Sequence, residues 1–271
     1  MQQYCLYPSS LKDREWLILE PLLPKAHTRG RKQRDRRQIL DAIFYVLRSG
    51  CAWREMPKHF GPWSTVYDIY RKWNKSGVWS RIHDALRDLV RKKAGKGKAP
   101  TAAALDSQSV KTPEGGERGY DAGKKVKGRK RHILVDSLGL LLGVKVTSAA
   151  LQDRDGAVEL LSGLFMLYWR LAVIWADSAY SGLLTKWVKG LRPHGKLHLE
   201  VIDKDPGQKG FCVLRKRWIV ERTFAWLVKW RRLRCDYERN ISHSEAMIQI
   251  AMIGLMVRRL ARPSRGKRIK K

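Results

Sequence analysis

Three acidic residues stand where a lone carboxylate is costly to bury. Asp106, Asp177 and Glu221 each lie among aliphatic or aromatic neighbours along the chain, and an ionised carboxylate in such a setting is normally paired with a cation or bound to a metal. Carboxylate oxygens suit Mg²⁺ or Mn²⁺. Two such ions can activate a water or hydroxyl nucleophile and stabilise the leaving oxygen of a phosphodiester. We therefore predict that these three acids are catalytic and hold Mg²⁺ or Mn²⁺, as two ions.

The segments around these acids are predicted to be two strands and a helix. A short apolar run over 102–110 predicts a strand that carries the first acid, and the run over 171–176 predicts a buried strand that ends just before the second. After residue 213, Val220, Phe224 and Leu227 keep a helical period, so the third acid is expected on a helix.

The other segments of this region complete an α/β pattern. An Asp-Ser pair at positions 136 and 137 separates two apolar runs and predicts a hairpin. The region 101–261 is therefore expected to form an α/β domain with a mixed five-stranded sheet and flanking helices. The remaining expected elements are strands at 132–135, 138–146 and 197–202, helices at 153–167 and 179–191, and a final long helix.

Residues 1–91 differ in character and are predicted to be helical. A stretch rich in Lys, Gly and Ala over 92–100 is expected to be the linker to the α/β domain, and a basic tail is expected over 262–271. The segment 52–74 has the rhythm of a helix-turn-helix, which could read DNA bases. A helical packing domain gives the same pattern, so both interpretations stay open. The predicted DNA contacts in this region are Ser64, Thr65, Arg71 and Lys72.

The charge of the chain indicates a polyanionic partner. Among 271 residues there are 56 Lys plus Arg and 25 Asp plus Glu, which gives a formal net charge of +31. Nucleic acid is the natural partner, because each neutralised phosphate releases counterions. A long polar loop is expected over 112–128. The basic loop over 124–131, which follows the strand of Asp106, is a candidate to contact the DNA backbone, although a solvated face would look similar. The predicted contacts in the α/β domain are Lys124, Lys125, Lys127, Arg129, Lys130, Arg131, Arg217 and Arg222.

Several classes of protein are disfavoured. The first ten residues show no secretory signal, and the longest apolar stretch is too short to span a bilayer. The four cysteines form no Cys-x-x-Cys pair, which argues against a zinc site or a disulfide framework and suits a reducing cytoplasm. We expect a cytoplasmic protein without a membrane partner or a small-molecule cofactor.

Five motifs carry a family resemblance. They are Leu105-Asp-Ser-Gln-Ser-Val110, Gly128-Arg-Lys-Arg-His-Ile-Leu-Val-Asp136, Gln152-Asp-Arg-Asp-Gly156, Ala176-Asp-Ser-Ala-Tyr180 and Val220-Glu-Arg-Thr-Phe-Ala-Trp-Leu227. With these motifs the sequence resembles the DDE-type transposases of bacterial insertion sequences, and in particular the insertion sequence five family. The resemblance runs from about residue 7 to residue 261. It implies a ribonuclease-H-like fold in which Asp106, Asp177 and Glu221 form the catalytic triad.

The chain departs from the pattern of related transposases at two positions. Such proteins often carry Tyr, Arg, Glu and Lys at fixed helical spacing. Arg217 stands four residues before Glu221 and fits the Arg, whereas Leu214 occupies the Tyr position and Val228 the Lys position, with Lys229 next to it.

The resemblance also implies what the protein does with DNA. It implies binding to terminal inverted repeats, cleavage at the element end, and attack of a 3′ hydroxyl on double-stranded target DNA, with at least a homodimer assembled on the DNA. Two alternatives remain open at this level. One is a metal-dependent nuclease without strand transfer, and the other is a helix-turn-helix DNA-binding regulator that would need only the N-terminal region.

Overall fold

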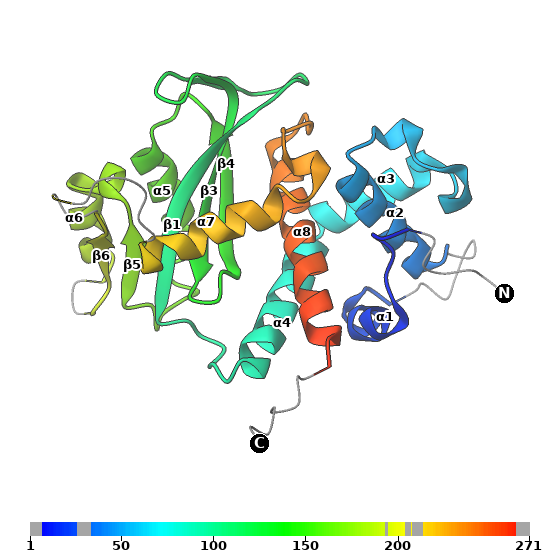
Figure 1. Ribbon diagram of the computed structural model, residues 1–271, viewed down its shortest axis with the longest axis horizontal. Helices are drawn as coiled ribbons and strands as arrows, with labels where there is room; N and C mark the ends of the chain where they lie inside the picture. Colours follow the sequence, from blue (N-terminus) through cyan, green and yellow to red (C-terminus); the bar gives the residue numbers. More distant parts are fainter. Residues whose placement is uncertain (1–6, 26–33, 193–194, 204–206, 208–213, 264–271) are drawn as a thin grey trace. The chain divides into compact units, whose positions relative to one another are not determined.

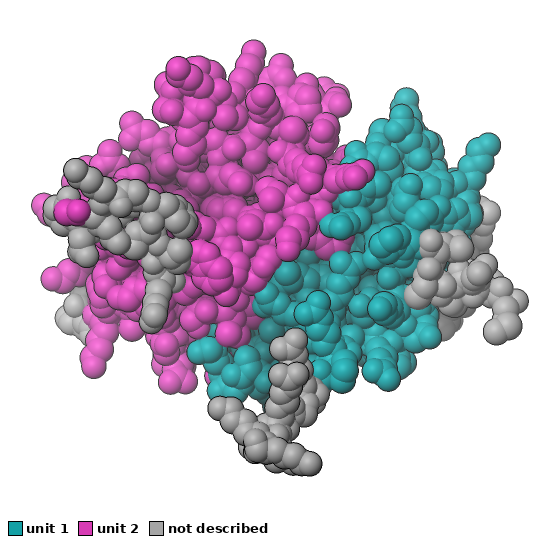
Figure 2. Space-filling model, in the orientation of Figure 1, with its two compact units in different colours: residues 1–96, 249–271 teal, residues 97–248 magenta. Residues whose placement is uncertain are grey.

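The structure is a computed structural model, and it describes residues 7–25, 34–192, 195–203, 207 and 214–263. The chain divides into two units, of which unit 1 comprises residues 1–96 with 249–271 and unit 2 comprises residues 97–248 (Figure 2). Unit 2 contains a mixed sheet with helices and unit 1 is helical, as expected. The expected boundaries placed the last helix wholly with the sheet, whereas the structure divides that helix between the two units.

The sheet of unit 2 is built around one long antiparallel pair (Figure 1). β1 and β3 run antiparallel, β4 pairs with β3, and β1, β5 and β6 are parallel neighbours in that order. β2 pairs with the beginning of β3. The strands are β1 (Ala102–Lys111), β2 (Gly119–Asp121), β3 (Val126–Asp136), β4 (Leu141–Ser148), β5 (Val173–Ala176) and β6 (His198–Val201).

The sheet has six strands in the described residues, so the prediction of five was wrong. The additional strand, β2, lies within the segment 112–128 that was expected to be a loop. β3 also begins at Val126, six residues before the expected apolar run. The sequence hides this part of β3 because its core-facing positions include arginine and lysine, which are normally found outside.

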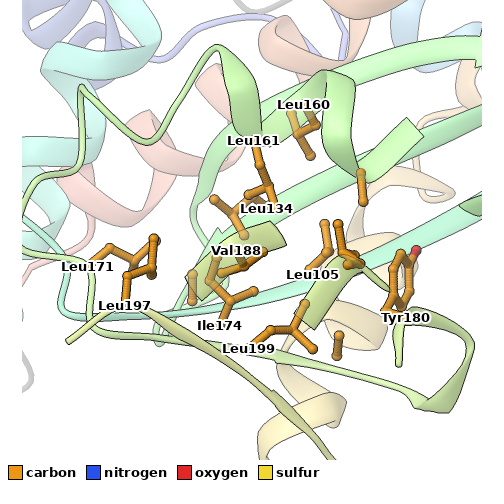
Figure 3. Close-up of a cluster of buried hydrophobic side chains, with 14 of the residues drawn as sticks. Leu105, Leu134, Leu160, Leu161, Leu171, Ile174, Tyr180, Val188, Leu197 and Leu199 are labelled. Carbon is orange, nitrogen blue, oxygen red and sulfur yellow. The ribbon is translucent and has the colours of Figure 1, made fainter. Parts of the chain in front are cut away.

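Three helices of unit 2 cover the sheet (Figure 1). α5 (Asp153–Ser162) and α6 (Leu183–Gly190) share a hydrophobic cluster with one face of the sheet, to which Leu105 on β1 and Ile174 on β5 contribute (Figure 3). α7 (Arg215–Leu227) packs against β1, β3 and β5. Because side chains alternate along a strand, Leu105 faces the cluster and Asp106 faces the opposite side.

The predicted hairpin at Asp136 is present. One carboxylate oxygen of Asp136 accepts hydrogen bonds from Leu138 N at 2.8 Å and Leu140 N at 2.9 Å. Gly139 has a φ of 77°, which glycine adopts without the strain that a side chain would cause. The aspartate thus acts as an Asx turn and ends β3 before β4 begins.

Unit 1 is helical, but two short 3-10 turns stand where the first helix of a helix-turn-helix was expected. Residues 53–60 form two 3-10 turns, so the α-helix that precedes α3 is α2. Asp35 caps α2 through Arg37 N, and Gly50 ends it with a φ of 80°. The elements of unit 1 are α1 (Asp13–Leu19), η1 (Glu20–Leu22), α2 (Arg36–Ser49), η2 (Trp53–Glu55), η3 (Lys58–Phe60), α3 (Trp63–Lys75), α4 (Val78–Lys93) and the later part of α8 (Ile241–Ala261).

No helix among the described residues is long and apolar enough to cross a membrane. The expected linker begins inside α4, which continues to Lys93. Most of the expected basic tail, from residue 264 onward, lies outside the described residues.

Candidate active site

Asp106 lies in the middle of β1, within the β1–β3 pairing, which is the longest in the sheet. It stands opposite Ile133 of β3, and its carboxylate accepts a hydrogen bond from Ser107 N at 2.7 Å. Burial, together with the nearby charge of Asp177, raises the pKa of this carboxyl to about 6, against the opposing effects of the Ser107 amide and the cations of Arg217 and Lys124. The group is thus a partly buried carboxylate with a second one nearby.

The strand register brings Asp177 beside Asp106. β1 and β5 are parallel, and Ala104 pairs with Trp175. Two residues further along each strand, the same register places Asp106 level with Asp177 and on the same face, because side chains repeat every second residue. β5 ends at Ala176, and Asp177 then begins the 3-10 turn η4 (Ser178–Tyr180) by accepting a hydrogen bond from Ala179 N at 3.0 Å.

Glu221 joins these acids through Arg217. α7 packs on β1 and β5, and Arg217 lies one turn before Glu221 on this helix. One guanidinium nitrogen of Arg217 is 3.6 Å from Asp177 Oδ2 and 3.8 Å from Glu221 Oε1. The Arg217 charge also acts on Asp106. The three predicted catalytic acids therefore share one arginine as their common cation.

The donor set fits a hard divalent cation, although the carboxylates are not gathered into a complete site. Among the residues that the structure describes, no group of three or more His, Cys, Asp or Glu side chains is placed to hold a metal ion. The residues nevertheless offer oxygen ligands that Mg²⁺ or Mn²⁺ prefers. Two in-register carboxylates, one of them partly buried with a raised pKa, also need a positive charge between them.

Comparison with known proteins identifies the family. A family model described as "Transposase DDE domain" matches residues 97–256, and one described as "Putative transposase of IS4/5 family" matches residues 11–83. The chain belongs to the DDE transposase family. The predicted resemblance is thus confirmed, and with it the ribonuclease-H-like fold and an enzyme that acts on DNA phosphodiesters.

Two curated relatives come from Burkholderia cepacia. The chain is 33% identical over 115 residues to "Insertion element IS402 uncharacterized 16.2 kDa protein", a match that covers 40% of this chain and 77% of the relative. It is 29% identical over 154 residues to "Putative transposase for insertion sequence element IS402", a match that covers 54% of this chain and 70% of the relative. Both relatives are named for an insertion element.

Three of the predicted DNA contacts of the transposase lie inside the protein. Arg129 and Arg131 are 0% and 1% exposed, and Lys130 is 6% exposed. Their expected location on a surface loop was wrong, since all three lie on β3. A buried cation whose donors already bind the protein has no free surface for phosphate, so we do not assign DNA contacts to these residues.

The buried cations instead hold loops onto the sheet. The Arg129 guanidinium donates to the carbonyl oxygens of Glu117, Glu238 and Arg239, and it lies 3.4 Å from Asp236. This set connects the loop before β2 with the segment between α7 and α8. It therefore holds the segment that follows α7 against β3.

The two other buried cations act in the same way. Arg131 donates to the carbonyl oxygens of Leu233 and Cys235. Lys130 donates to Leu151 O at 2.8 Å and pairs with Asp153 at 3.0 Å.

The other predicted DNA contacts are accessible or partly so. Lys124, Lys125 and Lys127 are exposed around the turn between β2 and β3. Arg222 is partly buried, because its guanidinium lies 4.7 Å from the ring centroid of Trp218 and 4.9 Å from that of Trp226. In unit 1, Thr65 is half-buried on α3, and the exposed predicted residues there are Ser64, Arg71 and Lys72.

Sequence reasoning missed a group of polar residues beneath the acids. Ser107 and Tyr180 are buried, at 7% and 1% exposure. Ser107 directly follows one predicted catalytic aspartate, and Tyr180 closely follows the other. Both lie inside the motifs that carry the family resemblance, yet nothing in their type or spacing distinguishes a packed hydroxyl from a functional one. Gly156 was likewise unexplained: a β-carbon there would collide with the ring of His132, so glycine permits α5 to approach β3.

Proposed function

We propose that this transposase cuts DNA at the ends of its element and joins the freed 3′ ends to target DNA, using Asp106, Asp177 and Glu221 as ligands for Mg²⁺ or Mn²⁺. The observation that supports it most strongly is the parallel register of β1 and β5, which sets two carboxylates side by side, with Arg217 of α7 near all three acids. Such a set of oxygen ligands on rigid elements is what phosphoryl-transfer chemistry requires.

The protein's own residues have distinct parts in this proposal. Asp106 is fixed by the β1–β3 ladder, Asp177 by its cap on η4, and Glu221 by the packing of α7. A bound divalent cation would supply Lewis-acid activation of the attacking oxygen and charge stabilisation of the leaving one. Arg217 neutralises Asp177 and Glu221 when no other cation is present, and it is placed to contact a DNA phosphate once the acids have another partner.

DNA binding is proposed to involve both units. The net charge of +31 favours binding to any DNA through counterion release. In unit 2, Lys124, Lys125 and Lys127 offer exposed cations near the acids, since the Lys124 charge acts on Asp106. In unit 1, the exposed face of α3 is the candidate for reading the terminal repeats. Because two ends must be joined in one event, we propose a homodimer on DNA.

A nuclease without strand transfer would use the same acids, so the decisive experiment measures joining. The full chain is incubated with Mg²⁺ and a duplex that carries the end sequence flanking its gene, together with a labelled target plasmid. Strand transfer predicts covalent joining of the cut 3′ end to the plasmid. Cleavage without any joined product would contradict the proposal and favour the nuclease.

A regulator that only binds DNA is the second alternative. It requires no catalytic acids, and the DDE domain match over 97–256 disfavours it. A duplex that is bound in a gel shift but never nicked with Mg²⁺ or Mn²⁺ would favour this alternative over the transposase.

A further inference from the structure

Tyr180 has a buried hydroxyl whose position is unexplained by packing alone. Its ring belongs to the hydrophobic cluster under the sheet, together with Leu105 and Ile174. Figure 3 shows it at the edge of that cluster, with its oxygen directed away from the leucine and isoleucine side chains. Among the residues that the structure describes, Tyr180 Oη is buried and has no hydrogen-bond partner. An unmet buried hydroxyl costs about 1–3 kcal/mol, so a phenylalanine would be the better packing residue here.

The surroundings of this hydroxyl are polar and acidic. Burial raises the pKa of Tyr180 above its usual value, and the charges of Asp106 and Asp153 act in the same direction, while the neighbouring Ser107 hydroxyl opposes them. Ser107 Oγ is itself buried and has no ordinary hydrogen bond among the described residues. Two neighbouring buried hydroxyls without partners are normally satisfied by each other or by one bridging water.

Ser107 also adjoins Asp153, the partly buried acid at the start of α5. Burial alone would raise the pKa of Asp153, but the Lys130 ammonium, the nearby Ser107 hydroxyl and the charge of Lys124 bring it below its usual value. α5 packs on both η4 and β1. The Ser107 hydroxyl therefore lies between Tyr180 and Asp153, whose carboxylate pairs with Lys130 of β3.

The chain positions of the two hydroxyls give the contact its meaning. Ser107 follows Asp106 by one residue, and Tyr180 follows Asp177 by three. Asp177 caps the same short turn that Tyr180 ends. A link between these hydroxyls therefore ties the backbone behind one acid to the backbone behind the other, on the face of the sheet opposite the acids.

We propose that Tyr180 is a positioning residue that, through Ser107, sets the spacing of Asp106 and Asp177. The side chain does not touch the reacting atoms. It anchors η4 to β1, so that the two carboxylates are held at the separation that a shared cation needs. Partners behind the ligands of a metal typically alter metal affinity or activity by about 10–100-fold when removed.

Tyr168 is a matched control within the same cluster. It is also buried, at 8% exposure, but its hydroxyl donates to Leu142 O at 2.9 Å. Tyr168→Phe removes a satisfied hydroxyl, while Tyr180→Phe removes the unsatisfied one beside the acids. Both variants keep the ring, so a difference between them reports the position of the hydroxyl and not the packing.

The test measures Mn²⁺ binding to the full chain by calorimetry, with and without an end duplex, alongside thermal unfolding. We expect Tyr180→Phe to weaken Mn²⁺ binding about tenfold and Tyr168→Phe to leave it unchanged. Ser107→Ala should weaken binding similarly, and the double variant Ser107→Ala with Tyr180→Phe should be no worse than either alone, since both remove one link.

The inference rests on the proposed metal site, and the outcomes separate the two. If Asp177→Asn abolishes Mn²⁺ binding but Tyr180→Phe binds like Tyr168→Phe, the positioning role is overturned and the metal site stands. If the wild-type chain binds no Mn²⁺ in either state, both are overturned. Should Tyr180→Phe fail to fold, Ser107→Ala decides alone: unchanged Mn²⁺ affinity overturns the proposal.

Discussion

Each unit of this transposase contains an aspartate whose pKa is raised, and the two aspartates differ in what surrounds them. In unit 1, burial raises the pKa of Asp41 to about 6, but its carboxylate accepts a hydrogen bond from Leu11 N at 2.7 Å and lies near Arg37. In unit 2, burial raises the pKa of Asp106 to about 6, and the next contribution of the same sign comes from the facing carboxylate of Asp177.

The difference separates a structural acid from the acid that is proposed to be catalytic. Asp41 helps to join two segments of unit 1. It accepts a hydrogen bond from Leu11 N, and Arg37, one turn before it on α2, donates to Leu11 O at 2.7 Å. The short hydrogen bond that Asp106 accepts comes from the following residue, so it connects no second segment of the chain to Asp106. A similar shift in pKa thus accompanies a completed contact in one unit and a concentration of negative charge in the other. The second arrangement is the one that marks functional sites.

The largest effect should follow from neutralising an acid of unit 2. Asp106→Asn or Asp177→Asn keeps side-chain size but removes a proposed metal ligand, so we expect cleavage to fall on the order of a thousandfold or more. DNA binding should persist, because it depends on the basic surface. Cleavage and gel-shift assays on the same preparation measure this, with Asp41→Asn as the control in unit 1. Wild-type cleavage by either variant would remove its acid from the catalytic set.

A large loss of stability is expected when the buried cation of β3 is removed. Arg129→Ala removes a donor from three carbonyl oxygens and the ion-pair partner of Asp236, at a position where the arginine is 0% exposed. Breaking such a buried pair costs about 3–5 kcal/mol of unfolding free energy. Chemical denaturation would measure it, and Lys127→Ala, at an exposed position of the same strand, should change little. An Arg129→Ala protein of normal stability with weakened DNA affinity would instead restore this residue to the DNA surface.

The two aspartates with raised pKa values, Asp41 and Asp106, should respond alike to pH and differently to metal. A raised folded-state pKa favours folding at low pH, and that stability is lost as pH rises through about 6. In metal-free protein at pH 7.5, Asp106→Asn should therefore be more stable than wild type by up to about 3 kcal/mol, given about 1.4 kcal/mol per pKa unit. This advantage should shrink between pH 6 and pH 4.

Added Mn²⁺ sharpens that comparison. A cation that binds only folded protein raises its stability, so Mn²⁺ should raise the melting temperature of wild type and of Asp41→Asn but not of Asp106→Asn. Scanning calorimetry at pH 7.5 measures all three proteins. Equal stabilisation of Asp106→Asn would place the metal elsewhere.

The smallest effects should come from exposed cations, and they differ between units. Replacing Lys124, Lys125 and Lys127 with alanine should weaken binding to every duplex and reduce the slope of log affinity against log salt by about 0.9 for each phosphate that is no longer neutralised. Replacing Arg71 and Lys72 on α3 should reduce the preference for the element end over unrelated DNA. Fluorescence anisotropy over a salt series measures both, and identical behaviour of the two sets would mean that α3 makes only backbone contacts.

Much of the fold and the family could be predicted from local patterns. The strands around the two aspartates, the helix of Glu221 and the turn at Asp136 follow from apolar periodicity and turn chemistry, which act over a few neighbouring residues. The motifs identified the family for the same reason, since they are short and contiguous. Locally encoded properties of this kind need no knowledge of what packs against them.

Other features depended on contacts between distant residues. The basic run 129–131 was expected at the surface because of its composition. The carbonyl oxygens that accept hydrogen bonds from its two arginines lie as far as 110 residues away in the sequence. β2 was hidden because a three-residue strand acquires its identity from pairing with β3. No local pattern encodes such partners.

The sequence by itself determined which acids are present, which elements carry them and that the chain is strongly cationic. Only the tertiary structure decided that β1 and β5 pair with Ala104 opposite Trp175, which sets Asp106 level with Asp177, and that Arg217 lies between Asp177 and Glu221. It also brought the Ser107 and Tyr180 hydroxyls together, 73 positions apart in the sequence. The physical reason is that residue types fix local preference and charge, whereas register, burial and hydrogen-bond partners arise from packing between segments far apart in the chain.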